Sequence, residues 1–497
     1  MPTTPCPRCA STRGAGLHRC PGPADAVRWL RLPPAAEALL AVLSSVGRPL
    51  VVGGTVRDAL LREVDRPVPE VGPPDVDVEL HDAADAEAVV AVLRATGAVV
   101  VTAGAAFPVC KVVLDDTHLD VAVVPGTVAD DDALDAAVAS SAHRRDLTVN
   151  AVAWDVVRNE LLDAVGGIDD ARAGLLRHAS RHFGDDPLRV LRLVRFVARY
   201  GCAVHPETIA LARALGDRWD AIARERLWPE VRRLTEGDQQ SAALAVLHAT
   251  GWERHLPELA AVRDVPQDPT WHPEGPVHVH AGLAADAAAR ACRAAGVAGE
   301  RRVVVVLASL LHDLGKAGSG TQRVVGEDGS VRIRSLGHEV SGAAAATALL
   351  RRLGAPRAVV QEVAVLVREH MVAHSTTGAP PSVPAARRLL RRLGGSLETA
   401  EAWARVCEAD AQGRGPAASR SPAWAWLAVM AGDQVAGRRA RLVTGRELVD
   451  AGLEPGPSFR ALLAEAADAQ DDGVFDDVSA ARRWLAARLA ERAADPD

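Results

Sequence analysis

The feature that most constrains this chain is the segment Val51–Asp58, where an apolar run ends at two glycines and an amphipathic stretch begins. An apolar run before the glycines and helically spaced apolar residues after them predict a turn that leads into a helix. The glycines leave backbone amides bare at the start of that helix, and such amides bind phosphate groups. The segment therefore predicts a phosphate seat, and its candidate nucleotide-binding residues are Gly53, Gly54, Arg57 and Asp58.

A second constraint follows in Asp75–Leu80, where acidic and apolar residues alternate. On a strand this period of two places Asp75, Asp77 and Glu79 on one face. Two carboxylates on one face suit Mg²⁺, which bridges the oxygens of a nucleoside triphosphate. An acidic strand face is commonly just exposed to solvent, so neither motif is sufficient alone. The acidic face together with the glycine turn predicts a nucleotidyltransferase. Asp120, within an apolar strand-like run, is a third candidate catalytic carboxylate or a strand-edge aspartate.

Length and composition limit the number of domains, the partners and the location that can be expected. A chain of 497 residues predicts roughly two to four domains. The net charge of −7 does not favour nucleic-acid binding, but it averages over domains and hides local patches. Neither a membrane span nor a signal-peptide pattern is found, so we expect no membrane partner and a cytoplasmic location.

The cysteines do not predict a disulfide framework, because the seven are odd in number and mostly scattered. Cys6 and Cys9, with His18 and Cys20, could form a small zinc knuckle. The surrounding segment has few apolar residues to pack, and residues 1–30 are predicted to form a flexible tail.

The pattern along the chain predicts an α+β fold class. Residues 31–155 alternate short Val-rich runs with Ala-rich helical stretches, which indicates a mixed α/β head. Residues 156–264 read as an all-α body. The Pro-rich stretch 265–276 cannot continue a helix and marks a boundary, after which residues 265–412 form a second helical domain. Residues 413–497 read as C-terminal helices.

Arginine-bearing segments follow the acidic strands. Arg145 lies in a short charged segment with Asn150, and arginines of this kind clamp triphosphates bidentately. Farther on, Asp186 and Pro187 precede arginines at a spacing of three, namely Arg189, Arg192 and Arg195. The Asp-Pro pair is typical of a well-started helix, and the arginines form a basic ridge on it. A basic ridge on a partly buried helix predicts an anionic ligand.

These motifs together resemble one family, the class II tRNA nucleotidyltransferases, which are the CCA-adding enzymes and related bacterial poly(A) polymerases. The resemblance spans roughly residues 50 to 235 and rests on Gly53-Gly54-x-x-Arg57-Asp58, Asp75-x-Asp77, Arg144-Arg145-Asp146-x-Thr148-x-Asn150, Asp186-x-x-Arg189-x-x-Arg192-x-x-Arg195-Phe196 and Arg224-Glu225-Arg226 with Glu230.

The resemblance implies a polymerase-β-like head in which Asp75 and Asp77 hold Mg²⁺. It also implies that Gly54, Arg57 and Arg145 bind the triphosphate, and that the incoming nucleotide contacts Asp186, Arg189, Arg192 and Arg195. After Asp120 the chain departs from the family, because Val121–Gly126 stands where members often carry an arginine and further polar residues. The metal role of Asp120 therefore stays open.

The chemistry of the bases is consistent with such a role. Adenine and cytosine each present an amino donor beside a ring-nitrogen acceptor, whereas guanine and uracil present the reverse. One Asp acceptor beside one Arg donor could accept both wanted bases and leave buried groups unpaired for the others. The expected partners are accordingly tRNA, CTP and ATP, with the protein as a monomer or a homodimer.

A second constellation of histidines and aspartates lies beyond the Pro-rich stretch, on segments predicted to be helical. Its members are His280, His312, Asp313, His338, His370 and Asp410. A lone histidine is more often a core or surface residue than a ligand, but imidazole and carboxylate together suit a transition metal or Mg²⁺.

The ordered set resembles the HD phosphohydrolase domain. This resemblance implies His280, His312, Asp313 and Asp410 as core metal ligands, with His338 and His370 as extra ligands or phosphate contacts. The metal would be Mg²⁺ or a transition metal such as Ni²⁺, Mn²⁺ or Co²⁺.

The sequence thus predicts a CTP/ATP-dependent enzyme that adds or repairs the 3′-terminal CCA of tRNA, with an appended metal-dependent phosphohydrolase. The resemblance implies 2′,3′-cyclic phosphodiesterase, 2′-nucleotidase and phosphatase activities for the appendage. A poly(A) polymerase or a partial enzyme that adds only A or only CC remains an alternative. Alternatives of a different class are an HD phosphohydrolase or an RNA-binding protein with an inactive head.

Overall fold

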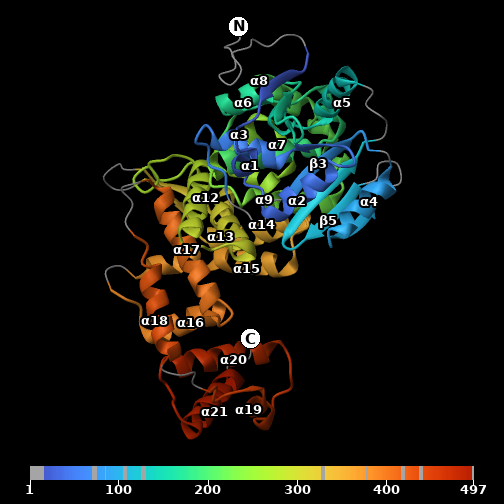
Figure 1. Ribbon diagram of the computed structural model, residues 1–497. Helices are drawn as coiled ribbons and strands as arrows, with labels where there is room; N and C mark the ends of the chain where they lie inside the picture. Colours follow the sequence, from blue (N-terminus) through green and yellow to red (C-terminus); the bar gives the residue numbers. More distant parts are fainter. Residues whose placement is uncertain are drawn as a thin grey trace. The chain divides into compact units, whose positions relative to one another are not determined.

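The computed structural model (Figure 1) describes residues 16–69, 75–83, 85–103, 109–124, 130–318, 320–325, 331–376, 379–415, 420–435 and 440–494. The chain divides into two units, Met1–Pro257 and Glu258–Asp497, and each is described by itself. This division lies ahead of the boundary at 264/265 that the sequence predicts.

The first unit is built on an eight-stranded sheet with the order β1-β8-β7-β2-β3-β6-β5-β4. The strands are β1 (His18–Pro21), β2 (Arg48–Val52), β3 (Asp75–His81), β4 (Val99–Ala103), β5 (Val109–Leu114), β6 (Thr117–Val123), β7 (Ala153–Asp155) and β8 (Glu160–Asp163). Strand β3 runs antiparallel to β2 and parallel to β6, and Asp77 pairs in register with Val52 on one side and Asp120 on the other. This register brings the acids of β3 to the end of β2, where the glycine turn begins.

The predicted glycine turn is confirmed. Strand β2 ends at Val52, and helix α3 (Gly54–Arg62) begins directly after Gly53. Gly53 has a φ of 72°, in the left-handed region that favours glycine. A Cβ at Gly53 would lie 2.7 Å from the Oδ2 of Asp77. The turn therefore needs glycine both for its backbone conformation and for its close approach to the acidic strand.

The remaining helices of the sheet region are α1 (Ala26–Leu30), α2 (Pro34–Leu43), α4 (Ala86–Ala95), α5 (Asp131–Arg144) and α6 (Gly167–Ala173). Strand β3 keeps the predicted period of two, since Val76, Val78 and Leu80 are buried in the core. The opposite face of the strand is thereby left for the acids.

The expectation of a flexible tail through residue 30 is wrong for residues 16–30. Strand β1 pairs antiparallel with β8, and the segment that follows it forms helix α1. The cause is backbone pairing together with burial, because Cys20 and Leu30 are both in the core. Cys6 and Cys9 of the suggested zinc knuckle lie outside the described residues.

A helical region completes the first unit with α7 (Leu188–Tyr200), α8 (Pro206–Ala214), α9 (Leu227–Leu234) and α10 (Gln240–Ala249), and with β9 (Leu175–Leu176) paired to β10 (Ala203–Val204). Helix α7 buries apolar residues such as Val190 and Leu193 between its arginines. Its start is stabilised by Asp186, whose Oδ1 accepts from the Leu188 amide at 3.1 Å. The predicted well-started helix with a basic ridge is therefore present.

The described residues of the second unit are helical apart from one hairpin, β11 (Thr321–Val325) with β12 (Val331–Ser335). Its helices are α12 (Val277–Ala294), α13 (Gly299–Leu311), α14 (His338–Arg352), α15 (Arg357–Glu369), α16 (Val383–Arg392), α17 (Leu397–Gly413), α18 (Ala423–Val435), α19 (Gly445–Asp450), α20 (Pro457–Asp471) and α21 (Val478–Ala494), and α11 (Pro257–Ala261) lies at the junction of the units. Helices α19 to α21 share a core of their own around Leu448, Leu462 and Phe475.

The predicted α+β fold class is confirmed, with a sheet-bearing head, a helical body and further helices behind them. Among the described helices, none combines the length and the apolar composition that crossing a bilayer requires.

Candidate functional site

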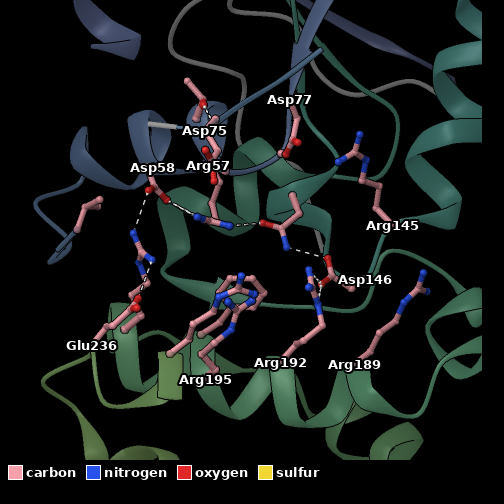
Figure 2. Close-up of a pocket in the computed structure, with 18 of the residues that line it drawn as sticks. Arg57, Asp58, Asp75, Asp77, Arg145, Asp146, Arg189, Arg192, Arg195 and Glu236 are labelled. Atoms are coloured by element: carbon pink, nitrogen blue, oxygen red, sulfur yellow. Dashed lines mark hydrogen bonds and ion pairs between the residues drawn. The ribbon is translucent and has the colours of Figure 1, made fainter. Parts of the chain in front are cut away.

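The first unit contains a pocket of about 860 Å³ that gathers most of the residues predicted to bind nucleotide and metal. Figure 2 shows Asp75 and Asp77 on one side of it and the arginines of α7 on the other. The predicted residues that line the pocket are Gly53, Gly54, Arg57, Asp58, Asp75, Asp77, Arg145, Asn150, Asp186, Arg189, Arg192 and Arg195. Asp120 is the one predicted residue of the head that is not part of this lining.

The carboxylates of β3 and β6 are close enough to influence one another. Although the residue is exposed to the pocket, partial desolvation of its carboxyl raises the pKa of Asp77; Arg145 opposes that rise, and the negative charges of Asp120 and Asp75 add to it. Asp120 is in register with Asp77, and its Oδ2 lies 3.1 Å from the Nζ of Lys111 on β5. Carboxylates that repel one another in this way are well suited to a hard divalent cation. The residues present therefore fit a magnesium site.

Arg145 is held beside the acids by Glu79, the third member of the acidic face of β3. The Nη2 of Arg145 donates to Glu79 Oε1 at 2.7 Å, and Ser141 Oγ donates to the same oxygen at 2.7 Å. Burial disfavours the ionised form of Glu79, but His81, Arg145 and Ser141 outweigh it and lower the pKa to about 2. Sequence reasoning placed Glu79 on the correct face and assigned it no role; the period of two was the available signal.

Three of the predicted nucleotide-binding residues are paired with one another beneath the pocket. Arg57 Nη1 donates to Asn150 Oδ1 at 2.8 Å, and Asn150 Nδ2 donates to Asp146 Oδ1 at 2.7 Å. Arg57 Nε also donates to Asp58 Oδ1 at 2.8 Å. Asp58 accepts from Tyr200 of α7 at 2.8 Å. The network ties α3 to α7 and fixes the floor of the pocket, a role the motifs did not reveal.

The arginines of α7 differ in their surroundings. Arg192 Nε donates to Asp146 Oδ2 at 2.8 Å, which joins it to the same network. Arg195 lies 3.0 Å from Glu230 Oε2 and over the ring of Phe196, and burial lowers its pKa to about 10 despite the charge of Glu230. Arg189 donates to the carbonyl oxygens of His182 and Arg144.

Asp186 is paired with Arg226, a residue of the family motif to which the sequence analysis gave no role. Arg226 Nη2 donates to Asp186 Oδ2 at 2.6 Å, and Arg226 also lines the pocket. Burial raises the pKa of Asp186, but Arg226 and the Leu188 amide outweigh it, so the pKa falls below its usual value. Asp186 is thus held as an acceptor at the end of the row of arginines.

The second unit brings all six predicted histidine and aspartate ligands together in one buried cluster, the HD cluster. They are His280 on α12, His312 and Asp313 directly after α13, His338 at the start of α14, His370 directly after α15, and Asp410 on α17. Each is at least nine-tenths buried.

Asp313 lies at the centre of the HD cluster. Its Oδ2 is 3.2 Å from His312 Nε2 and 3.9 Å from His280 Nε2. Its Oδ1 is 3.3 Å from His338 Nε2 and 3.9 Å from His370 Nε2. Asp410 Oδ1 lies 3.1 Å from His280 Nε2. Each Asp313 oxygen therefore faces its own pair of imidazoles.

Outer partners orient these imidazoles. The Nδ1 atoms of His312, His338 and His370 lie 2.8, 2.6 and 2.6 Å from the carbonyl oxygens of Ser309, Ser335 and Val367. Since a carbonyl can only accept, each Nδ1 carries a proton and each Nε2 faces the centre of the cluster, where it can bind a metal. The Nε2 atoms of His338 and His370 lie 3.3 Å apart. His312 Nε2 and both oxygens of Asp313 are buried and form no hydrogen bond of good geometry, although Lys316 Nζ lies 2.6 Å from Asp313 Oδ2. These orphaned atoms fit a bound cation.

The neighbours of the HD cluster shift the pKa values of its histidines and aspartates. Burial disfavours the charged form of His280, but Asp410 and Glu274 outweigh it and raise the pKa to about 9. Burial and the neighbouring His312 lower the pKa of His370 to about 3. Burial would raise the pKa of Asp313, yet His312 and Lys316 hold it well below its usual value. The centre thus keeps an ionised carboxylate in a buried position.

Two supporting residues of the HD cluster had no role assigned from the sequence: Lys316 stood out only as one of two lysines in the chain, and Glu274 was not singled out. Glu274 Oε1 lies 2.6 Å from His280 Nδ1 and 2.9 Å from His272 Nδ1. Lys316 Nζ lies 2.6 Å from Asp313 Oδ2 and donates to Gln267 Oε1 at 2.7 Å. The short spacing of Lys316 after His312-Asp313 was a usable signal, whereas Glu274 lies in a Pro-rich stretch that reads as a linker.

Comparison with known proteins identifies the class of both sites. Residues 50–177 match the family model of the poly A polymerase head domain, and residues 277–410 match that of the HD domain. The chain therefore contains a region that matches the poly A polymerase head domain and a region that matches the HD domain, in agreement with the resemblance that the motifs indicated.

Within that class the chain is similar to multifunctional CCA proteins. It is 38% identical over 279 residues to the Xanthomonas campestris pv. campestris (strain B100) protein and 35% identical over 279 residues to that of Acinetobacter baumannii (strain AYE). The matches cover 54% of this chain, which spans 64% and 63% of the lengths of these relatives.

Solved structures share the fold. The CCA-adding enzyme of Bacillus stearothermophilus in complex with CTP gives a TM-score of 0.58 at 21% identity, over 93% of this chain and 99% of that one. The Thermotoga maritima CCA-adding enzyme complexed with tRNA gives 0.54 at 17% identity, over 93% of this chain and 98% of that one.

Proposed function

We propose that the first unit is a CTP/ATP-dependent tRNA nucleotidyltransferase that adds or repairs the 3′-terminal CCA. The observation that carries this proposal is that Asp75 and Asp77 of β3 face the arginines of α7 across one pocket. The similarity to multifunctional CCA proteins favours this activity over poly(A) addition.

In this reaction the 3′-hydroxyl of the RNA attacks the α-phosphate of the nucleotide, and pyrophosphate leaves. Asp75 and Asp77 would hold Mg²⁺, which when bound lowers the pKa of the attacking hydroxyl and stabilises the pyrophosphate charge. Arg145 and the amides of Gly53 and Gly54 would bind the triphosphate.

Base selection is proposed for Asp186 and Arg189. Asp186 keeps acceptor capacity beyond its bonds to Arg226 and the Leu188 amide, because an ionised carboxylate offers about four lone-pair sites. Arg189 carries donors that can face a ring nitrogen. Arg226 would keep Asp186 ionised and in place, so we assign it a positioning role.

The direct test incubates the purified protein with tRNA that lacks CCA and with each labelled triphosphate, followed by sequencing of the products. We expect C, C and A to be added in that order and then termination. A long A tract would indicate a poly(A) polymerase, and addition of A alone or of CC alone would indicate a partial enzyme. No addition with any triphosphate would contradict the proposal and leave a silent head that binds RNA.

We further propose that the HD cluster is a metal-dependent phosphohydrolase site that acts on 2′,3′-cyclic phosphates, 2′-nucleotides and phosphomonoesters. The observation that carries this is the set of orphaned buried atoms on His312 and Asp313. Two groups of ligands, one with His280 and His312 and one with His338 and His370, share Asp313. We therefore propose that these ligands together with Asp410 would hold a divalent cation, with Mg²⁺, Ni²⁺, Mn²⁺ or Co²⁺ as candidates, which when bound would activate a water for attack on the phosphate.

The stoichiometry of metal per chain, measured by elemental mass spectrometry after dialysis, tests this second site together with hydrolysis assays. We expect bound metal at the HD cluster and hydrolysis of 2′,3′-cyclic AMP. A protein without bound metal would contradict the metal site, and no hydrolysis with any of the four metals would contradict the phosphohydrolase. A cytoplasmic location and a monomer or homodimer remain predictions.

A further inference from the structure

A second pocket of the first unit lies at the far end of the acidic face of β3. It has a volume of about 360 Å³, and its lining consists of Arg48, His81, Asp82, Asp130, Asp131 and Arg158. Successive side chains of a strand alternate between its faces, so His81 shares a face with Asp77 and Glu79. The strand therefore leads from the large pocket of the candidate nucleotide site, the nucleotide pocket, to this second pocket.

Helix α5 also reaches both pockets. Near its C-terminus, Ser141 lines the nucleotide pocket and donates to Glu79. Asp130, the N-cap of the helix, and Asp131 in its first turn line the second pocket. One strand face and one helix thus connect the two pockets.

Two of the acids around the second pocket are compensated by its arginines. Arg48 Nε donates to the buried Asp155 Oδ2 at 2.9 Å. Asp131 Oδ1 lies 3.2 Å from Arg48 Nη1 and 2.8 Å from Arg158 Nη2. The two positive charges of the lining are therefore matched by Asp155 and Asp131.

Asp82 and Asp130 remain as acceptors in the lining. Asp82 is exposed, and its carboxylate has no hydrogen-bond or ion-pair partner among the residues that the structure describes. Asp130 uses Oδ1 to accept from the Ala133 amide at 2.9 Å and keeps Oδ2. The lining thus carries two negative charges that its arginines do not balance.

His81 is a buried polar group in the wall of this pocket. Its side chain is 1% exposed, and neither ring nitrogen has a hydrogen-bond partner in the described part of the chain. Nε2 lies 3.7 Å from Glu79 Oε2, too far for a hydrogen bond. A buried polar atom without a partner is costly, so the ring nitrogens indicate that a ligand completes the site.

We propose that the second pocket binds the primary ammonium group of a small organic cation and that the bound cation strengthens nucleotide binding in the nucleotide pocket. An ammonium group donates three hydrogen bonds, and the lining offers acceptors on Asp82, Asp130 and His81. The groups of described residues that bring three candidate metal ligands within 4.8 Å of one another do not include these three, so a metal ion with its shorter bonds fits less well. The volume of the pocket is within the range of small-molecule sites.

The coupling between the pockets follows from the two ring nitrogens of His81. An ammonium group that donates to Nδ1 places the ring proton on Nε2, which faces Glu79 Oε2. His81 then becomes a donor to the same carboxylate that holds Arg145 through Oε1. Arg145 is proposed to bind the triphosphate, so the coupling rests on the proposed nucleotidyltransferase function, whereas the ammonium site does not.

Isothermal titration calorimetry of the full-length protein at constant ionic strength tests the ammonium site directly. We expect n-butylammonium chloride to bind and tetramethylammonium chloride to give no heat of binding, because the quaternary ion has no N–H donor. Equal binding of both salts would reduce the site to general attraction of cations and overturn the ammonium assignment.

The two uncompensated acids are tested together. Asp82→Asn/Asp130→Asn should weaken butylammonium binding by about tenfold or more, since both charges are lost. Asparagine can cap α5 at position 130 and tolerates the φ of 55° at position 82, so folding is preserved. The control Asp116→Asn/Asp132→Asn removes as much charge from exposed positions outside the lining and should leave binding unchanged. Unchanged binding in the first variant would overturn the site.

Coupling to the nucleotide is measured as KM for CTP in the extension of tRNA that lacks CCA. Butylammonium should lower this KM by about two- to fivefold at unchanged kcat, because Arg145 is held more firmly. His81→Leu, which removes both ring nitrogens, should lose the effect. An effect that persists in Asp82→Asn/Asp130→Asn would come from the action of the cation on the tRNA and would overturn the coupling.

The remaining outcomes separate the ammonium site from the proposed function. If the protein adds no nucleotide but binds butylammonium, and Asp82→Asn/Asp130→Asn loses that binding, the nucleotidyltransferase fails and the site stands. Butylammonium binding with an unchanged KM for CTP would overturn the coupling. Mn²⁺ is titrated in the same way; Mn²⁺ binding that the double variant loses, with no binding of butylammonium, would assign the pocket to a metal ion and overturn the proposal.

Discussion

The two candidate sites place their carboxylates in contrasting surroundings. Asp75 and Asp77 lie on an exposed strand face that opens into a large pocket, where arginines supply the neighbouring charge. Asp313 and Asp410 are almost completely buried, and histidines supply their neighbours. An open, all-oxygen set suits Mg²⁺ that arrives with a nucleotide, whereas a buried set that mixes nitrogen and oxygen suits a tightly held resident ion. The difference predicts that the two sites can be disabled separately.

The largest effect is expected at the open site. Replacing Asp75 and Asp77 together with Ala should lower nucleotide addition by about a thousandfold or more, because the metal seat is removed while the arginine surface remains. RNA binding and hydrolysis of 2′,3′-cyclic AMP should be retained. Single-turnover extension of tRNA lacking CCA measures the effect.

Asp116→Ala is a suitable control for this double variant, because Asp116 is exposed on the turn between β5 and β6. Extension by the double variant at nearly the wild-type rate would mean that the metal assignment is wrong. A simultaneous loss of RNA binding and of the circular dichroism signal would instead indicate misfolding.

The matching experiment at the buried site is Asp313→Ala. Since Asp313 faces four imidazoles, its loss should abolish phosphodiesterase and phosphatase activity and lower the bound metal, with CCA addition retained. Ni²⁺, Mn²⁺ or Co²⁺ should favour the histidine-rich site, while Mg²⁺ supports the head.

Asp313→Asn serves as the conservative partner, because it keeps the volume of the side chain and removes its charge. If either variant stops CCA addition without unfolding the protein, the two sites are coupled and the contrast between them breaks down.

A smaller effect is expected from Glu79, which positions Arg145 in the open site. Glu79→Gln keeps one acceptor oxygen for Arg145 but loses the charge, so KM for the nucleotide should rise by about three- to tenfold with little change in kcat. Glu79→Ala should raise KM further, because Arg145 is then released. Steady-state kinetics with CTP and ATP distinguish these outcomes.

A loss of kcat with KM unchanged would contradict the positioning role of Glu79 and point to a direct part in metal binding. Ser141→Ala, which removes the second donor to Glu79, should have a weaker effect in the same direction.

The contrast between the open site and the buried HD cluster also explains how much of each could be predicted from the sequence. The acids of β3 and the ridge of α7 follow regular periods, so their shared faces could be predicted from spacing alone. The six members of the HD cluster could be named only as an ordered set that resembles a family, because they come from separate helices. Tertiary pairing decided part of the rest, because Glu79 with Arg145 and Arg57 with Asn150 join residues far apart in the chain. The contacts of Asn150 with Asp146 and of Glu274 with His280 are local, but no periodic pattern marks them.

The N-terminal segment shows the limit of composition as evidence. Its few apolar residues suggest a tail, but the backbone of residues 18–21 pairs with β8, which no local pattern encodes. Likewise, the Pro-rich stretch after residue 265 reads as a linker, yet Glu274 within it contacts His280 and Asp268 closes a turn onto β12.

The last effect is one on specificity rather than on rate: the open site should select between bases, whereas no such selection is expected of the buried site. Asp186→Asn keeps an oxygen that can accept from the Leu188 amide, so the start of α7 is preserved while the carboxylate acceptor is lost. We therefore expect the kcat/KM ratio of CTP or ATP to UTP or GTP to fall by about 10- to 100-fold, with little change in triphosphate affinity. Arg189→Ala should act in the same direction, and Arg226→Ala more weakly, because Arg226 only positions Asp186. An unchanged ratio with a raised KM would mean that Asp186 is a helix cap and Arg189 a general phosphate contact, and selection would then have to come from the RNA.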